Sequence, residues 1–380
     1  METVPDGSRM TVIKINMPGM DDLEENLLRQ ADILPMIDTF RFVKLELTDE
    51  SLIGEIDKLD VFEDRMYIMD MMTSSLFVFD VNGKYLFKIN NVGQGPQEYI
   101  QLDFFDIDRK NKQLVLTDLM GYWIMRYDMN GKFISRTKIP FWVEWVAPID
   151  TGYSLYANYR DNSNKFKQDY NLYITDSLMH IRKAFFPYNS SIYNNPRLKL
   201  PPTGIYYYCG DSCRFLSRSY NTIYSITSEG LQALFKFDFG KFTFNSEKFN
   251  NRNELEKYLE GGNYYQLNCI AENKNFIHFS FYNAAFPFYF FGFYSKSTGN
   301  VIFSGSLSDG TGFGGGYPAA AFDDYHVTEL KIDELLSWKE GIKTIKPKIE
   351  NDWMKEMKKI TDSITEDDNS VLLFYKLKPF

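Results

Sequence analysis

A repeat of 48 residues constrains the fold of this 380-residue chain more than any other sequence feature. Asp70 and Asp118 each end a run of apolar and β-branched residues, and they are 48 positions apart. The pairs Asn82-Gly83 and Asn130-Gly131 keep the same spacing, and a looser third copy contains Asp176. Asn-Gly between apolar runs is a strong hairpin signal, and its residues accept the positive dihedrals of a type I′ turn. The chain therefore contains at least three copies of a hairpin-built unit.

Repeats of about 40 to 50 residues with four short strands are typical of β-propeller blades, whereas helical repeats are about 33 to 34 residues long. An aromatic share of 17% also favours sheet. We predict blade one with strands near 56–62, 65–70, 76–80 and 84–90, blade two over 103–139, blade three over 143–186, blade four over 205–239 and blade five over 265–306.

A sixth blade can be assembled from the two ends of the chain. It combines 319–330 and 371–378 with the early strand 39–47. Pairing a strand from the start with strands from the end closes the ring and removes exposed sheet edges at the seam. The predicted fold class is therefore all-β, a six-bladed β-propeller of four-stranded antiparallel blades closed by an N-terminal strand.

Two segments have helical rather than strand periodicity. Residues 352–364, which include Trp353, predict an amphipathic helix packed on the last blade. Residues 21–33 show a second helical pattern. We therefore predict an N-terminal extension with a short helix over 1–38, followed by the propeller over 39–380.

Composition limits the classes of partner. There are 42 Lys and Arg against 51 Asp and Glu, a net charge of -9, so nucleic acid is not an expected partner. No apolar run reaches the roughly 18 to 20 residues that cross a bilayer, and residues 1–11 lack a signal-like apolar stretch. We expect a monomer that reaches a membrane only through a lipid anchor missing from this sequence.

Cysteine and histidine give weak signals. Cys209 and Cys213 flank a short turn and could form one disulfide, although buried free thiols are the commoner arrangement. The three histidines fall in different predicted blades without the spacing of zinc ligands, so no zinc site is expected.

Three stretches of the chain resemble a known group, the bacterial six-bladed β-propellers related to NHL-repeat proteins. They are 42–54, the loop Gly93-Gln-Gly-Pro-Gln-Glu-Tyr99 and the ending 366–378, and the resemblance covers about 39–378. Members often carry Gly where Gln97 stands and Pro where Ser370 stands, and the loop 308–317 is remodelled here. Many members resemble exported lipoproteins. The resemblance thus implies a binding role outside the cytoplasm, in the periplasm or at the outer membrane, and no catalytic residues.

Hairpin topology predicts which face of the ring carries a ligand site. If the first strand of each blade lines the channel, the Asn-Gly turns lie on the bottom face and the loops after the second and fourth strands open at the top. The loops 93–99 and 310–317 then share a rim around a central funnel. The candidate ligand-binding residues on or near this rim are Gln94, Glu98, Tyr99, Asp70, Asp118, Trp123 and Tyr317.

Structural explanations compete with these binding roles. Aspartates that recur in repeats commonly cap turns, which applies to Asp70 and Asp118. The loop 93–99 needs glycine and proline merely to join two blades. Both explanations remain open at this stage.

Two function hypotheses follow from different classes. The first is a non-enzymatic binding or scaffold propeller that engages a glycan, peptide or envelope protein at the funnel. The second is a propeller lyase or hydrolase that uses rim carboxylates, with calcium as its one candidate cofactor. Three or more carboxylates or histidines converging within about 5 Å would favour the enzyme. An apolar funnel lined by Tyr and Trp would favour binding.

Overall fold

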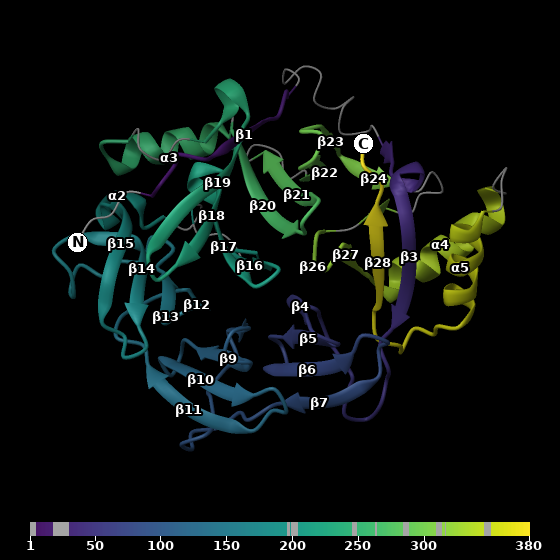
Figure 1. The fold of residues 1–380 in the computed structure, drawn as a ribbon, viewed down its shortest axis with the longest axis horizontal. Helices are drawn as coiled ribbons and strands as arrows, with labels where there is room; N and C mark the ends of the chain where they lie inside the picture. Colours follow the sequence, from purple (N-terminus) through teal and green to yellow (C-terminus); the bar gives the residue numbers. More distant parts are fainter. Residues whose placement is uncertain are drawn as a thin grey trace.

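Six four-stranded antiparallel sheets surround a central axis in the computed structural model (Figure 1). The structure describes residues 5–17, 30–195, 198, 204–244, 249–262, 264–283, 289–308, 314–315, 317–345 and 351–380. The first strands of neighbouring blades contact each other around the axis, as β8 does β12 and β4 does β26. The predicted fold class is therefore confirmed.

Five blades follow the chain from the axis outward, close to their predicted ranges. Blade one has β4 (Lys58–Phe62), β5 (Arg65–Asp70), β6 (Ser75–Asp80) and β7 (Tyr85–Ile89). Blade two has β8 (Phe104–Asp108), β9 (Gln113–Asp118), β10 (Trp123–Asp128) and β11 (Phe133–Lys138). Blade three has β12 (Trp145–Ile149), β13 (Gly152–Tyr156), β14 (Asp169–Asp176) and β15 (Ile181–Tyr188). Blade four has β16 (Tyr206–Cys209), β17 (Ser212–Ser217), β18 (Thr222–Thr227) and β19 (Gly230–Asp238). Blade five has β20 (Tyr265–Glu272), β21 (Phe276–Asn283), β22 (Tyr289–Ser295) and β23 (Val301–Ser304).

The sixth blade joins both ends of the chain, as the sequence predicted. It contains β26 (Ala320–Phe322), β27 (Tyr325–Leu330), β28 (Val371–Leu377) and, as the outermost strand, β3 (Ile37–Lys44). The strands β28 and β3 pair antiparallel, with Leu373 opposite Phe42. Asn369 adds a tie across the seam, because its amide donates to the Ser51 carbonyl at 2.8 Å and accepts from Ile53 at 2.9 Å.

The repeated hairpin turns differ in geometry from the turn type that the sequence predicted. Gly83 and Gly131 have φ of 89° and 82°, whereas the asparagine before each glycine has no positive φ. A bulge interrupts the strand pairing next to both turns. The turns are therefore of the glycine-bulge kind rather than the predicted type I′. In the third copy, Met179 holds the positive φ, at 66°.

The N-terminal segment lies along the outside of the ring. Strand β1 (Thr11–Lys14) pairs parallel with the outer edge of β19 in blade four. Strand β2 (Gln30–Asp32) pairs parallel with β24 (Ser306–Ser308), which also pairs with β25 (Gly314–Gly315). The prediction of a helix over 21–33 is wrong for residues 30–32, which form this strand because they pair with β24, and residues 21–29 lie outside the described ranges. The domain division at residue 38 stays a prediction.

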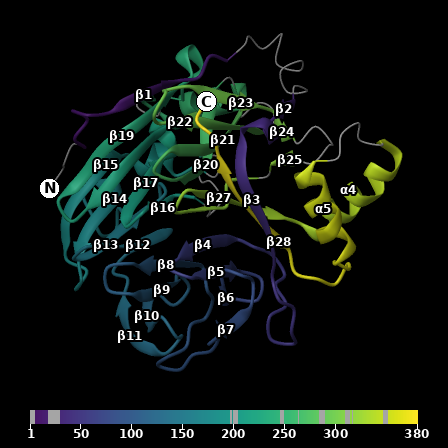
Figure 2. The ribbon, with the colours of Figure 1, turned by 45° about the vertical axis from the view of Figure 1, so that its right-hand side comes forward.

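Helices add to the outside of blade six (Figure 2). The predicted C-terminal helix is confirmed as α5 (Asp352–Asp362), whose Trp353 ring lies 4.9 Å from Phe40 and 5.4 Å from Phe42 of β3. Helix α4 (Ile332–Ile345), which the sequence analysis did not predict, packs beside it. Shorter helices are α2 (Ser190–Tyr193) and α3 (Arg252–Gly261). No helix in the described ranges is long and apolar enough to span a bilayer.

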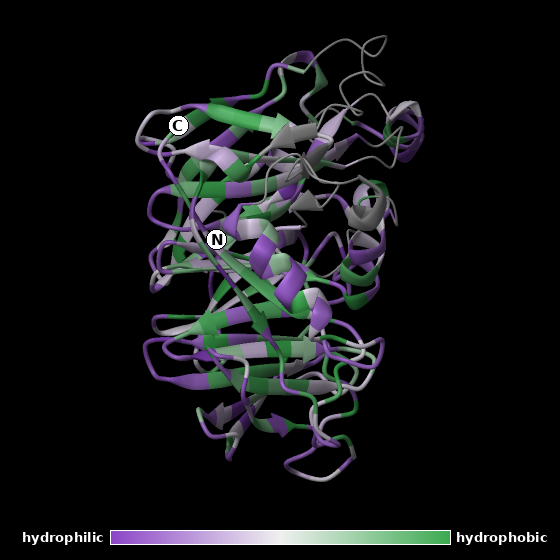
Figure 3. Ribbon diagram, turned by 90° about the vertical axis from the view of Figure 1, so that its right-hand side faces the viewer, coloured by the Kyte–Doolittle hydropathy of each residue, from purple (hydrophilic) through white to green (hydrophobic). Residues whose placement is uncertain are grey.

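Strand alternation places the core between the blades. Hydrophobic residues concentrate in the strands, while hydrophilic residues are frequent in the connecting loops (Figure 3). The three cysteines are free thiols. In the β16–β17 hairpin, Cys209 lies opposite Ser212, and Tyr208 lies opposite Cys213. The two cysteines therefore point to opposite faces of the sheet, and the considered disulfide does not form.

Candidate functional site

A cavity of about 500 Å³ lies at the centre of the ring. The first strands of four blades line it, namely β4, β16, β20 and β26. Glu55, Gly204 and Tyr317, which precede three of these strands, mark its mouth. The mouth therefore opens on the face that carries the links between blades, which we call the link face.

Three consecutive tyrosines of β16 form one wall of this cavity. The Tyr207 hydroxyl donates to Glu272 Oε2 at 3.0 Å, and the Tyr208 hydroxyl donates to the Pro148 carbonyl at 3.4 Å. The Tyr206 hydroxyl lies 2.6 Å from Ser154 Oγ. Burial raises the pKa of all three phenols well above the ordinary value, so they stay neutral. Alanines 319–321, Leu59 and Ile270 add apolar surface to the lining, which also contains charged side chains.

The charged groups deep in the cavity are paired. Glu272 is buried and binds Lys296 Nζ at 2.6 Å and Arg214 Nε at 3.2 Å. Asp60 Oδ1 accepts from Arg109 Nη2 at 2.7 Å, and the Arg109 guanidinium stacks on Tyr208 at 4.3 Å. Each of these two carboxylates therefore faces a cation, and neither is a free acid or base for proton transfer.

A third buried carboxylate, Asp106, lies near this network on the first strand of blade two. Asp106 Oδ2 is 3.8 Å from Lys58 Nζ, and its Oδ1 accepts from the Ile107 backbone at 2.8 Å. Burial raises the pKa of Asp106 to about 6, an effect that the nearby Lys58 opposes. The carboxyl therefore gains a proton under mildly acidic conditions.

Tyr317 is the predicted ligand-binding residue that the structure places at the cavity. Its ring is 45% exposed and lies edge-on to Tyr289 at 5.3 Å, with Phe291 at 5.1 Å on another side. The exposed aromatic edge at the mouth gives an entering ligand apolar contact area. The rest of the predicted loop 310–317 lies outside the described ranges, apart from Gly314–Gly315.

Asp70 and Asp118 lie on the link face as predicted, but their carboxylates point into the fold. Asp70 accepts from the Gly54 and Thr73 backbones at 2.9 and 3.1 Å. Asp118 accepts from Ile100 and Gly121 at 3.0 and 2.7 Å. Both side chains are fully buried, so this geometry matches the turn-capping alternative.

The loop 93–99 presents only part of the predicted set. The Gln94 and Glu98 side chains are exposed, and Glu98 Oε2 accepts from the Gly95 backbone at 2.7 Å. The Tyr99 ring is 1% exposed, and its hydroxyl donates to the Ser74 carbonyl at 2.8 Å. This burial corrects the expectation that the loop presents Tyr99 at the surface. The binding roles of Gln94 and Glu98 stay predictions.

Trp123 lies on β10, the third strand of blade two, and does not line the cavity. Its ring is half-buried and makes two cation–π contacts. Arg136 Cζ lies 4.2 Å and Lys138 Nζ lies 4.4 Å from the ring centre. These contacts occupy the ring face that stacking on a ligand would need. Its binding role also stays a prediction.

We looked for side chains that could bind a metal ion. Within the described ranges, no group of three or more His, Cys, Asp or Glu side chains is arranged to hold a metal ion. The calcium ion of the enzyme hypothesis stays a prediction.

A sequence model of one family matches almost the whole chain. This family, a domain of unknown function called DUF4934, matches residues 13–376. The chain belongs to the DUF4934 family. The relation of this DUF4934 propeller to NHL-repeat proteins stays a prediction. No curated protein sequence matches it.

Solved structures resemble this DUF4934 chain in fold. A protein of Bacteroides fragilis assigned as exported superposes with a TM-score of 0.73 at 20% identity, covering 97% of this chain and 100% of that one. A DUF4221 family member of Bacteroides vulgatus gives a TM-score of 0.49 at 9% identity, covering 90% and 97%. Virginiamycin B lyase of Staphylococcus aureus gives 0.41 at 12% identity, covering 76% and 82%. The first likeness shows a shared fold, and the other two are too distant to support an argument.

Sequence reasoning missed most of the cavity lining in this DUF4934 chain. The sequence analysis singled out neither the run Tyr206–Tyr208 nor Glu272 as site residues. Their position at the axis depends on which strand of a blade is innermost and on which side its residues face. The alternation along a four-residue strand is too short to show this.

Proposed function

We propose that this protein is a non-enzymatic binding propeller of the bacterial cell envelope, whose ligand enters the central cavity from the link face. The observation that carries this proposal is the cavity itself. Its Tyr206–Tyr208 wall and its alanine wall offer apolar surface with a few fixed hydroxyl groups, as small-molecule and peptide sites commonly do.

Binding fits the arrangement better than catalysis. A lyase or hydrolase would need rim carboxylates that can exchange protons with a substrate. Asp70 and Asp118 instead accept backbone hydrogen bonds, and Glu272 is held between two cations. These contacts engage all three carboxylates, while the tyrosines and alanines that line the cavity offer contact area to a ligand.

An envelope location completes the proposal. The resemblance to exported lipoproteins supports it, as does the fold shared with a B. fragilis protein assigned as exported. The partner would then be a glycan, peptide or protein outside the cytoplasm.

The test combines a ligand screen with a blocked cavity. Thermal shift is measured with glycans, peptides and divalent cations, since a ligand at a hundred times its Kd adds about 2.7 kcal/mol of stability. Ala319→Trp places a large ring in the cavity wall, and Met72→Trp, at an exposed hairpin of blade one, is the matched control.

We expect a ligand that stabilises the native protein and the Met72→Trp variant but not the Ala319→Trp variant. A ligand that stabilises all three equally would place binding elsewhere, and turnover of a ligand would replace binding with catalysis. A screen without any response would favour a scaffold without a ligand.

A further inference from the structure

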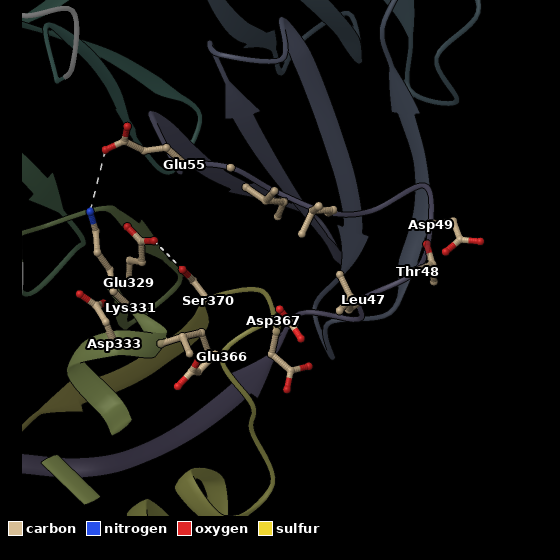
Figure 4. Close-up of a pocket in the computed structure, with 15 residues that line it drawn as sticks. Leu47, Thr48, Asp49, Glu55, Glu329, Lys331, Asp333, Glu366, Asp367 and Ser370 are labelled. Carbon is tan, nitrogen blue, oxygen red and sulfur yellow. Dashed lines mark hydrogen bonds and ion pairs between the residues drawn. The ribbon is translucent and has the colours of Figure 1, made fainter. Parts of the chain in front are cut away.

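A second hollow on the link face adjoins the mouth of the cavity (Figure 4). It has a volume of about 1100 Å³ and is lined by side chains from 47–55, 329–333 and 366–370. We call it the acidic groove. Glu55, Glu329 and Lys331 line both the groove and the cavity, so the two hollows are adjacent.

The groove has a large excess of negative charge. Seven carboxylates and one lysine line it. Lys331 Nζ lies 3.9 Å from Glu55 Oε1, and Asp368 is paired with Lys44 at 3.0 Å. No ion pair joins the exposed side chains of the remaining outer carboxylates to a cation in the described part of the chain. These four are Asp49, Asp333, Glu366 and Asp367.

Glu329 lies at the inner end of the groove, where nearby charges affect its pKa. Glu329 Oε1 accepts from Ser370 Oγ at 2.7 Å (Figure 4). Burial raises the pKa of Glu329, and the hydrogen bond from Ser370 and the charge of Lys331 oppose this effect. The nearby carboxylates Glu334 and Glu55 raise the pKa further, by less. A positively charged partner would relieve this like-charge repulsion, so the groove favours cations over anions.

Exposed aliphatic side chains lie beside these carboxylates. Leu52 is 61% exposed and Leu47 is 39% exposed, and Ile53 and Ile332 contribute further apolar surface. The residues that line the groove in the described ranges include no aromatic side chain on which a sugar ring could stack. Aliphatic contacts beside unpaired carboxylates match a peptide that carries both aliphatic and basic residues.

We propose that the acidic groove binds an extended basic peptide segment of a partner protein. Its Lys or Arg side chains contact Asp49, Glu366 and Asp367, and its aliphatic side chains cover Leu47 and Leu52. Past Glu55 and Lys331, the peptide continues towards the central cavity. That last step rests on the proposed function of the cavity, whereas binding in the groove does not.

The test measures binding of a fluorescein-labelled peptide of alternating Lys and Leu by fluorescence anisotropy. The groove variant is Asp49→Asn/Glu366→Gln/Asp367→Asn. The control variant is Asp64→Asn/Asp211→Asn/Glu229→Gln, in exposed hairpins on the opposite face. Both variants remove three negative charges, so non-specific attraction falls equally in the two proteins.

We expect about tenfold weaker binding by the groove variant, since each exposed charge pair contributes only modestly in water. The control variant should bind within about twofold of the native protein. Leu52→Ser should weaken binding without changing its salt dependence.

Equal affinity of the two triple variants would overturn the proposal, and so would a native protein that does not bind the peptide. Ala319→Trp separates the two sites. If this variant keeps full affinity while the groove variant loses it, groove binding stands and the route into the cavity fails.

Discussion

His278 and His326 are fully buried where blades five and six meet. His278 Nδ1 lies 3.1 Å from the Tyr375 hydroxyl, and His326 Nε2 lies 3.2 Å from Asn273 Nδ2. Burial lowers the pKa of His326 to about 3, with a further contribution from Lys296. Burial, followed by the charge of His326, also lowers the pKa of His278. Both rings are therefore neutral in the folded protein.

The two histidines should make the protein less stable in acid. A group whose pKa is lower in the folded state binds protons preferentially in the unfolded chain, so stability falls as pH drops below the unfolded pKa of about 6.5. Each histidine then costs roughly 1.4 kcal/mol per pH unit. His326→Gln keeps an acceptor for Asn273 and removes one of these groups.

The measurement is the free energy of unfolding in urea at pH 7 and pH 5. We expect the stability gap between the native protein and His326→Gln to shrink by about 2 kcal/mol at pH 5. Comparing the two proteins at each pH cancels the opposing effect of Asp103 and Asp106, whose pKa values burial raises to about 6. A gap that does not change with pH would mean that His326 is protonated in the folded state.

At the scale of elements, a pair of aspartates joins each of two links to the hairpin beside it. Asp103, in the link between blades one and two, accepts from the Leu119 backbone in the β9–β10 hairpin at 2.7 Å. Asp118, in that hairpin, accepts from the Ile100 backbone in the link at 3.0 Å, so each segment supplies an acceptor to the other. Asp57 and Asp70 do the same one blade earlier, with Met71 and Gly54. This repetition explains why the aspartates recur at a fixed spacing.

Replacing Asp118 by Ala should therefore destabilise the fold without affecting ligand binding directly. Leaving a buried backbone donor without an acceptor costs roughly 1–3 kcal/mol. We expect a loss of that size in urea unfolding, with Asp211→Ala, in an exposed turn, as the control. Unchanged stability with lost ligand binding would instead give Asp118 the binding role that the sequence analysis considered.

At the scale of the molecule, the sequence predicts the ring better than the site. Alternating runs and Asn-Gly turns are local signals, and they repeat, so the strands of blades one to five and the seam could be predicted. Strand β1 and the burial of Tyr99 could not, because the partners that fix them, β19 and Ser74, are distant in sequence or lie in another element. The Gly- and Pro-rich sequence around Tyr99 predicts an exposed loop residue. It carries no sign of the hydrogen bond to the Ser74 carbonyl.

The seam of blade six gives a prediction for the whole ring. Thr39 of β3 lies directly opposite Lys376 of β28, and neither side chain is buried. Thr39→Cys/Lys376→Cys in a Cys209→Ser background should form a disulfide that closes the ring covalently. A cross-link over so long a loop restricts the unfolded chain, so the free energy of unfolding should rise by roughly 2–4 kcal/mol. It should fall back to the value of the native protein when the disulfide is reduced.

The control is Thr39→Cys/Lys378→Cys, in which the two cysteines are two residues out of register. A disulfide that forms without any gain in stability would mean that the cross-link strains blade six or that β3 and β28 stay close together in the unfolded chain.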